Sequence, residues 1–252
     1  MTEQPVGSVF GRAWALLASN WIIIVPGLVI GVIVGVLRTV LTPTVVIGPD
    51  GPVLATGSVL ASVSSGLLIA LVSLVGYIAT VAYTTGMAGA AWQRGVTRIE
   101  DGAAAFRTDA GSILVTALGL FVLGVVAAIL SFPTLGLSLL AYYLFTLYAM
   151  PAAILGNLPG FAAIQASFRI ALKRLVPTLM VGLLIAVIAL IVGAFAGVLR
   201  LAPLVGPIVA ACVTQAAIAY ATLVIVGEYL ALRGSAASGP PPYGPPPSSN
   251  RL

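Results

Sequence analysis

The chain contains no histidine and a single cysteine, Cys212, among its 252 residues. Without histidine it lacks the side chain that proteins use most often as a general base near neutral pH and as a metal ligand. A single cysteine cannot form a disulfide within the chain, and its apolar surroundings suggest a small buried hydrophobe. The sequence therefore predicts no catalytic residue, no cofactor and no metal site, and argues against an enzyme.

Charged residues are scarce as well, at 7% of the chain against 60% hydrophobic residues. Ordinary soluble domains contain about 25% charged residues, so a soluble fold of this composition could not cover its own surface. The formal net charge of +5 comes from cations that stand between apolar stretches. Nucleic-acid binding requires a basic face in water, so anionic lipid headgroups are the expected partners instead. The composition predicts an integral membrane protein.

Six stretches are long and apolar enough to cross a bilayer, which requires about 20 residues of helix. They are residues 21–41, 58–92, 112–131, 137–156, 175–199 and 204–232. The second and sixth exceed the thickness of the hydrocarbon layer, so they are expected to tilt, kink or project beyond it. The predicted fold class is all-α, a polytopic membrane protein with six transmembrane helices.

The distribution of cations predicts the topology. If the N-terminus is inside, the outer side holds only Arg38 and Arg200 of the 11 Lys and Arg residues. Cytoplasmic loops are enriched in Lys and Arg, so both termini are predicted to be cytoplasmic. The first outer loop, residues 45–54, contains a Pro-Asp-Gly turn between two β-prone arms. This pattern predicts a small hairpin or an irregular loop.

Three segments have the pattern of an amphipathic helix that lies on the inner membrane surface. In NLPGFAAIQASFRIALKRL, before the fifth span, Phe161, Ile164 and Phe168 fall on one face and Arg169 and Lys173 on the other. Similar patterns occur in GSVFGRAWALLASNW before the first span and in RIEDGAAAFRTDAGSIL before the third. We expect the aromatic rings to enter the acyl boundary and the cations to face the headgroups.

The three segments share a register, which predicts an internal repeat. Trp14, Phe106 and Phe168 each stand seven residues before an apolar residue at the start of the next span, namely Trp21, Ile113 and Leu175. Each unit would be a surface helix followed by a helical hairpin. The units are residues 7–92, 97–156 and 157–232, within a membrane domain of residues 1–235 that precedes a Pro-rich cytoplasmic tail of residues 236–252, predicted to be disordered.

Several local features carry further expectations. Asp101 and Asn157 are predicted to cap the second and third surface helices. Glu100, Asp101 and Asp109 form the densest acidic group; capping and a solvated turn are expected, with a site for a hard cation as the alternative. In the tail, residues 240–243 match the PPxY pattern of WW-domain ligands, and an unstructured tail is the alternative.

The candidate contact residues are charged. Four cations are expected to contact lipid headgroups or an acidic partner, or else only to determine topology: Arg107, Arg169, Lys173 and Arg174. Glu228, near the inner end of the sixth span, is expected to pair with Arg107 or Arg169 and so tie that span to a surface helix. The alternative is that Glu228 reaches water beside Arg233.

Small and polar residues within the spans complete the predictions. Glycines at four-residue spacing are expected to allow close helix packing, with homodimerisation as the alternative; they are Gly27, Gly31, Gly35, Gly193 and Gly197. Pro26 and Pro151 are expected to kink their helices. The few polar residues are expected to hydrogen-bond between helices or to line a small cavity; they are Tyr83, Thr84, Thr85, Tyr142, Tyr143, Thr214 and Gln215.

Two long runs resemble a known family. GMAGAAWQRGVTRIEDGAAAFRTDAGSIL and AMPAAILGNLPGFAAIQASFRIALKR together resemble the membrane domain found ahead of some bacterial glycerophosphoryl diester phosphodiesterases, and related six-span families of unknown function. The resemblance covers most of residues 5–235 and implies a bacterial cell (inner) membrane protein. In that family catalysis belongs to a separate soluble domain. The residues after 232 hold no carboxylate and no histidine, so the phosphodiesterase activity is not carried over.

These features predict a non-enzymatic integral membrane protein that acts as a scaffold or as a module that binds lipid or a partner. The alternative is a transporter or permeation subunit for a lipid-like or small solute. No charged residue marks an ion or proton path at the membrane centre, which argues against coupled transport. A continuous polar cavity would favour transport, and a dry, well-packed bundle would favour the scaffold.

Overall fold

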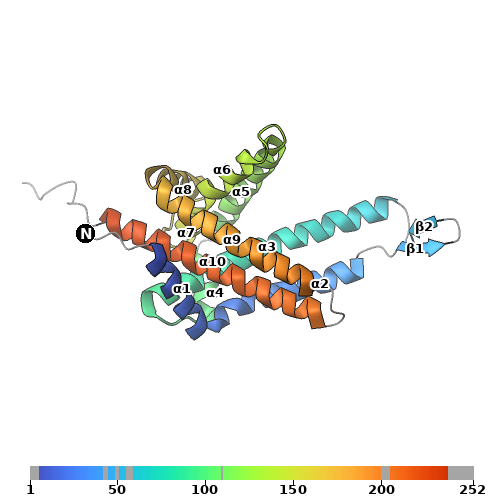
Figure 1. Cartoon of the computed structure of the whole chain (residues 1–252), viewed down its shortest axis with the longest axis horizontal. Helices are drawn as coiled ribbons and strands as arrows, with labels where there is room; N and C mark the ends of the chain where they lie inside the picture. Colours follow the sequence, from blue (N-terminus) through green and yellow to red (C-terminus); the bar gives the residue numbers. More distant parts are fainter. Residues whose placement is uncertain are drawn as a thin grey trace, which may run out of the picture.

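The computed structural model describes residues 6–41, 45–48, 51–54, 59–108, 110–199 and 205–237 (Figure 1). Apart from one β-hairpin, these residues form helices joined by short connections. The first part comprises α1 (Val6–Ser19), the 3₁₀ helix η1 (Trp21–Ile24), α2 (Val25–Leu41), β1 (Val45–Gly48), β2 (Gly51–Leu54) and α3 (Val59–Arg94). The remainder comprises α4 (Ile99–Thr108), α5 (Ala110–Ser131), α6 (Leu137–Thr146), α7 (Ala149–Ile154), α8 (Phe161–Lys173), α9 (Leu175–Leu199) and α10 (Val205–Ala237).

The prediction of a helical protein that spans the membrane several times is confirmed. Among the described residues, five helical segments are long and apolar enough to cross a bilayer, and the number reaches six if the bent pair of α1 with η1 and α2 counts as one span. The two parts of that pair meet at 90°. The element order is a short helix followed by two long segments, three times over, although the threefold repeat itself stays a prediction.

Between α2 and α3 the chain forms a hairpin, one of the two structures expected for residues 45–54. Strands β1 and β2 pair antiparallel, with Val45 opposite Leu54 and Gly48 opposite Gly51. In Figure 1 this hairpin lies at one end of the long axis, whereas α1, α4 and α8 lie toward the other. The side chain of Arg38, the residue Arg200 and the tail from residue 238 onward lie outside the described part.

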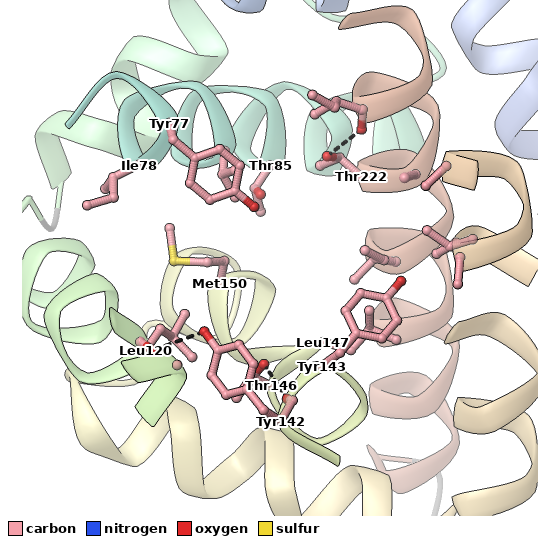
Figure 2. A pocket seen from close by; sticks show the side chains of 18 of the residues that line it. Tyr77, Ile78, Thr85, Leu120, Tyr142, Tyr143, Thr146, Leu147, Met150 and Thr222 are labelled. Atoms are coloured by element: carbon pink, nitrogen blue, oxygen red, sulfur yellow. Dashed lines mark hydrogen bonds between the residues drawn. The ribbon is translucent and has the colours of Figure 1, made fainter. Parts of the chain in front are cut away.

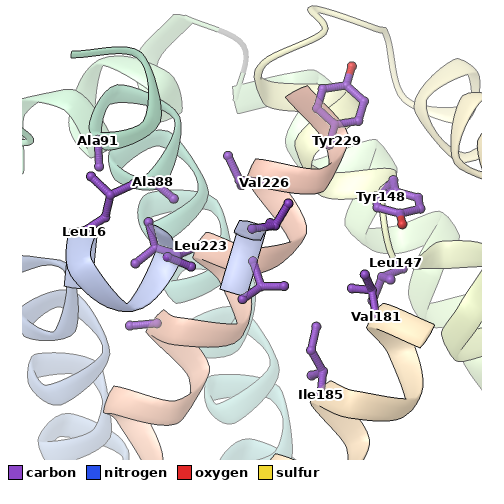
Figure 3. Packing of buried hydrophobic residues seen from close by; sticks show 14 of the residues in the cluster. Leu16, Ala88, Ala91, Leu147, Tyr148, Val181, Ile185, Leu223, Val226 and Tyr229 are labelled. Atoms are coloured by element: carbon purple, nitrogen blue, oxygen red, sulfur yellow. The ribbon is translucent and has the colours of Figure 1, made fainter. Parts of the chain in front are cut away.

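A buried core joins the helices at the end of the bundle away from the hairpin (Figure 3). Its largest fully buried side chains include Tyr148, Met87 and Leu223. The α1 helix contributes Leu16 to this core, and the edge of the Phe10 ring packs against Tyr220 of α10. The apolar face of α1 therefore packs partly on protein instead of only on lipid, while Trp14 remains 64% exposed.

Proline explains the break in the fourth span. Helix α6 ends at Thr146 and α7 begins at Ala149. A proline removes the hydrogen bond to the carbonyl four residues earlier and its ring clashes there, which for Pro151 is the carbonyl of Leu147. The side chain of Ser167 on α8 supplies hydrogen bonds to backbone groups at this break. Its Oγ donates to the Phe145 carbonyl (2.7 Å) and accepts from the Tyr148 amide (3.1 Å).

Other local expectations need correction. Pro26 stands in the first turn of α2, where proline is tolerated, so it kinks no helix interior. Asn157 does not cap α8, which begins at Phe161 with Gly160 in the cap position. Asp101 lies inside the first turn of α4, where its carboxylate accepts from the Arg98 amide (2.8 Å). This is the reciprocal half of a capping box rather than the cap itself.

The glycines divide into two groups. A Cβ at Gly27 would overlap the amide oxygen of Gln215 on α10, and one at Gly31 would meet the Gln215 amide nitrogen at 3.6 Å. These two glycines therefore face α10 inside the bundle. Gly193 and Gly197 of α9 have nothing within 4 Å of an added Cβ, so they support no helix contact among the described residues. The side chain position of Gly35 lies outside the described part.

Candidate functional site

The main candidate site is a cavity of about 920 Å³ within the membrane-spanning part (Figure 2). Ligand-binding pockets in proteins measure about 300–1,000 Å³, so this cavity is large enough for a drug-sized or lipid-like molecule. It lies between α3, α5, α6, α7, α9 and α10, and it is partly open to its surroundings. Its lining is mostly apolar, as Ile78, Leu120 and Met150 illustrate.

The cavity exists because one helical hairpin leans away from the others. Helices α5 and α6 hold each other through the Tyr142 hydroxyl, which donates to the Leu120 carbonyl (2.9 Å), and through Ser138 Oγ, which donates to the Ala127 carbonyl (2.7 Å). As a pair they diverge from α3, α9 and α10 in Figure 1. Many residues that face the gap are small, and their side chains do not fill it; they are Ala117, Gly124, Ala128, Ala186, Ala189, Gly193, Ala217 and Ala221.

Some hydroxyl groups in the cavity wall already have partners. The hydroxyls of Thr146, Thr214 and Thr222 each donate to the carbonyl four residues earlier in the same helix, at 2.7 to 2.9 Å. The hydroxyls of Tyr77 on α3 and Tyr143 on α6 differ, because neither makes a hydrogen bond among the residues that the structure describes. The two side chains come from opposite walls of the cavity.

A second, smaller pocket of about 250 Å³ lies between α2, α3 and α10. Its polar lining consists of Ser73, Tyr77, Thr80 and Gln215. The side chain of Tyr77 lines both pockets, and so does that of Ile218, so the two pockets adjoin. Ser73 Oγ is buried and has no hydrogen-bond partner within the described part of the chain.

The polar residues selected from the sequence divide between these two pockets and the packed core. Four line the large cavity, namely Thr85, Tyr142, Tyr143 and Thr214, whereas Gln215 lines the small pocket. Tyr83 and Thr84 line neither: Tyr83 packs against Gly102 of α4, and the Thr84 hydroxyl donates to the Thr80 carbonyl (2.8 Å). The sequence reasoning missed Ser73 and Tyr77. A signal existed, since the polar residues of α3 at 73, 77, 80 and 84 recur at helical spacing.

The four candidate cations lie on α4 and at the C-terminal part of α8. Arg169 and Lys173 are exposed on α8, while Arg107 is exposed on α4, which packs on α3. Arg174 is half-buried at the C-terminal end of α8 and acts electrostatically on Glu228. Glu228 is 6% exposed, and the expectation that it ties the sixth span to a surface helix stays a prediction.

Two other cations, Arg12 and Arg233, contact neighbouring helices at the end of the bundle that contains the buried core. The Arg12 guanidinium lies 4.7 Å from the ring centroid of Trp92 and donates to the Trp92 carbonyl (3.2 Å). Arg233 Nη1 donates to the Leu155 carbonyl (2.7 Å). These contacts hold α1 to α3 and α10 to α7 at the same end of the molecule. The sequence placed both cations on one side of the membrane but gave no sign of these partners.

The connection between α3 and α4 carries the acidic group. Asp101 pairs with Arg94 and accepts from the Thr97 hydroxyl (3.3 Å) as well as from the Arg98 amide. Burial is the largest single influence on the pKa of Asp101 and raises it, but the hydrogen bonds from Arg94, Arg98 and Thr97 and the charge of Arg94 together hold the pKa below its ordinary value. Asp109 lies outside the described residues, within which no group of three His, Cys, Asp or Glu side chains could hold a metal.

The lowered pKa of Asp101 predicts a pH dependence. A carboxyl group with a depressed folded-state pKa contributes stability that is complete above the unfolded-state pKa of about 4 and is lost as the pH falls through the folded-state value. We expect Asp101→Asn to melt at a lower temperature than the wild type at pH 7, with the difference shrinking toward pH 2.5. Thermal unfolding in detergent at both pH values measures this. Glu100→Gln, at an exposed neighbouring position, is the control, and a difference that persists at low pH would contradict the prediction.

No family model, curated protein or solved structure matches this chain.

Proposed function

We propose that this protein is a non-enzymatic lipid-binding module, and that its cavity takes up an apolar chain of a lipid from the surrounding bilayer. The observation that carries the proposal is the cavity of about 920 Å³, which is mostly apolar and partly open. Neither a continuous polar cavity nor a dry, fully packed bundle, the two extremes considered from the sequence, describes this arrangement.

A hydrocarbon chain is the occupant that fits this lining best. Apolar walls offer water few hydrogen-bond partners, and an unfilled cavity forfeits dispersion contacts along its whole surface. A lipid chain restores those contacts and needs no hydrogen bond from the wall. The bilayer also supplies lipid at high local concentration, so the site requires no separate delivery of ligand.

The exposed cations support a lipid partner at the membrane surface. Arg169 and Lys173 are exposed on α8, which precedes a membrane-spanning helix. Each cation near an anionic leaflet contributes about 1 kcal/mol of attraction. In our proposal this face is cytoplasmic, in the inner membrane of a bacterium, and α1, α4 and α8 lie on it. The resemblance to the membrane domain of glycerophosphoryl diester phosphodiesterases agrees with that setting and is part of the proposal.

Transport of a lipid-like solute is the second candidate function. The break between α6 and α7 favours it, because Leu147, Met150 and Pro151 all line the cavity and a break there lets the α5–α6 hairpin move relative to α7. The mostly apolar lining does not suit a small polar solute, so the transport hypothesis narrows to lipid-like molecules.

Filling the cavity tests the proposal. Gly193 lines it and has room for a side chain, whereas Gly197, one turn further along α9, has the same room but lines neither pocket. We expect Gly193→Trp to lose lipid that the wild type retains through delipidation in detergent, and Gly197→Trp to keep it. Native mass spectrometry of the purified proteins measures the bound lipid. Equal retention by both variants, or no retained lipid in the wild type, would contradict the proposal.

A further inference from the structure

The smaller pocket gives the cavity a polar extension. It opens beside the large cavity at Tyr77 and Ile218, whose side chains line both. The Gln215 amide reaches this pocket across the faces of Gly27 and Gly31, where the absence of side chains on α2 leaves space for it. Small residues on one helix thus place a primary amide deep within the membrane-spanning bundle.

Several groups around this junction have unused hydrogen-bonding capacity. Ser73 Oγ is buried without a partner, and the Tyr77 hydroxyl and the Gln215 amide make no hydrogen bond to any residue that the structure describes. Ser73 and Tyr77 stand one turn apart on α3, so they belong to the same side of that helix. Polar groups in the hydrocarbon region are normally satisfied by protein or ligand because the bilayer core offers them no water.

The lack of charged residues in the two described linings restricts the class of ligand further. Among the residues that the structure describes, neither lining contains an Asp, Glu, Lys or Arg residue. A phosphate or carboxylate group would therefore enter an environment without a counter-charge, which is strongly unfavourable in a medium of low dielectric constant. Hydroxyl and amide groups instead match an uncharged group that both donates and accepts hydrogen bonds, such as an alcohol, or one that accepts them, such as an ester carbonyl.

We propose that the ligand is an uncharged amphiphile with a hydroxyl and ester carbonyls, a diacylglycerol-like molecule, whose polar group enters the small pocket while its acyl chains occupy the large cavity. This inference rests on the proposed lipid-binding function and adds the class of lipid. Ser73 and Gln215 hold the polar group, and Tyr77 contacts it at the junction. Charged phospholipids are excluded from the small pocket and interact only with the exposed cations at the membrane surface.

Photo-crosslinking with a matched pair of lipids tests the ligand class. The full-length protein is reconstituted in phosphatidylcholine vesicles with a diacylglycerol or a phosphatidic acid that carry the same diazirine-labelled acyl chains. Labelled peptides are then identified by mass spectrometry. We expect the diacylglycerol probe to label the cavity-lining segments of α3, α6 and α10 more than the phosphatidic acid probe does.

Substitutions in the small pocket test whether Ser73 and Gln215 bind the polar group of the ligand. We expect Ser73→Ala and Gln215→Leu each to lower labelling by diacylglycerol about three- to tenfold, the range for a lost hydrogen bond between uncharged groups. Labelling by phosphatidic acid should change little. Thr84→Val is the matched control, because it removes a buried hydroxyl from α3 whose residue lines neither pocket. Equal melting temperatures show that the variants are folded.

The outcomes separate the two proposals. If neither probe labels the cavity segments, the lipid-binding function is overturned and this inference with it. If both probes label those segments equally, and Ser73→Ala and Gln215→Leu match the Thr84→Val control, lipid binding stands and the assignment of an uncharged polar group is overturned. A pocket that holds only ordered water gives this second result.

Discussion

Trp92→Ala is expected to lower the free energy of unfolding by about 3 kcal/mol, the lower end of the range for truncating a packed aromatic residue. Trp92 lies near the end of α3 and joins three helices. Its Nε1 donates to the Leu223 carbonyl of α10 (2.8 Å), its ring fills the space above Gly227, and the Arg12 guanidinium of α1 lies over it. Removing the ring opens a void at this junction and leaves the Leu223 carbonyl without that donor.

SDS-induced unfolding in mixed micelles, followed by circular dichroism, measures the effect. Trp92→Phe keeps a ring but removes the indole N–H, so we expect it to lose about 1 kcal/mol, the net value of one hydrogen bond. Trp21→Ala is the matched control, since Trp21 is 68% exposed and surface substitutions usually change stability by no more than about 0.5 kcal/mol. A Trp92→Ala variant as stable as Trp21→Ala would show that this junction does not hold the helices together.

The sequence predicted the helical elements well because hydrophobic length and periodicity are local properties. The fifth predicted span, residues 175–199, has the bounds of α9, and the others agree with the helices to within a few residues except where α6 ends. Pro151 was expected to produce a kink, and the regular helix is interrupted at residues 147–148, within a segment that still counts as one span. The hairpin was one of two alternatives for residues 45–54, and the pairing of β1 with β2 shows that it forms.

The cavity could not be predicted from the same patterns. Its volume depends on how far the α5–α6 hairpin leans from α3, α9 and α10, and no periodicity within one helix determines the angle between helices. The sequence analysis offered a small cavity only as the alternative to hydrogen bonds between helices, with Tyr142 and Tyr143 among the residues considered for it. It passed over Ser73 and Tyr77, since each polar residue was considered alone and not as part of a stripe along α3. The roles expected for Arg107, Arg169, Lys173 and Arg174 at the membrane surface stay predictions.

The structure adds an observation that supports the predicted repeat. The shared register places Asn20, Ser112 and Arg174 at equivalent positions, six residues after Trp14, Phe106 and Phe168. Asn20 bonds to the connection that follows α3, and Ser112 bonds to the connection that follows α7. Arg174 acts on Glu228 near the end of α10. In the first two units the residue at this position thus bonds to the connection that follows the unit's second span.

Asn20→Ala and Ser112→Ala test whether these two positions have the same structural role. Asn20 Oδ1 accepts from the Thr97 amide (2.9 Å), and Ser112 Oγ accepts from the Gly160 amide (2.9 Å) while donating to the Leu158 carbonyl (2.9 Å). Both amides are buried, so removing either acceptor leaves an unpaired donor, which costs about 1–3 kcal/mol. We expect each variant to lower the free energy of unfolding by about 2 kcal/mol.

Hydrogen exchange distinguishes this effect from general loosening. The Thr97 amide should exchange faster in Asn20→Ala with the Gly160 amide unchanged, and the reverse should hold in Ser112→Ala. Ser131→Ala is the control, because the Ser131 hydroxyl bonds only to the Ala128 carbonyl of its own helix (2.6 Å). Since the two sites share no hydrogen-bond partner, the double variant should show the sum of the two stability losses. If exchange at both amides is unaffected by either substitution, the equivalence fails, and the repeat rests on the register alone.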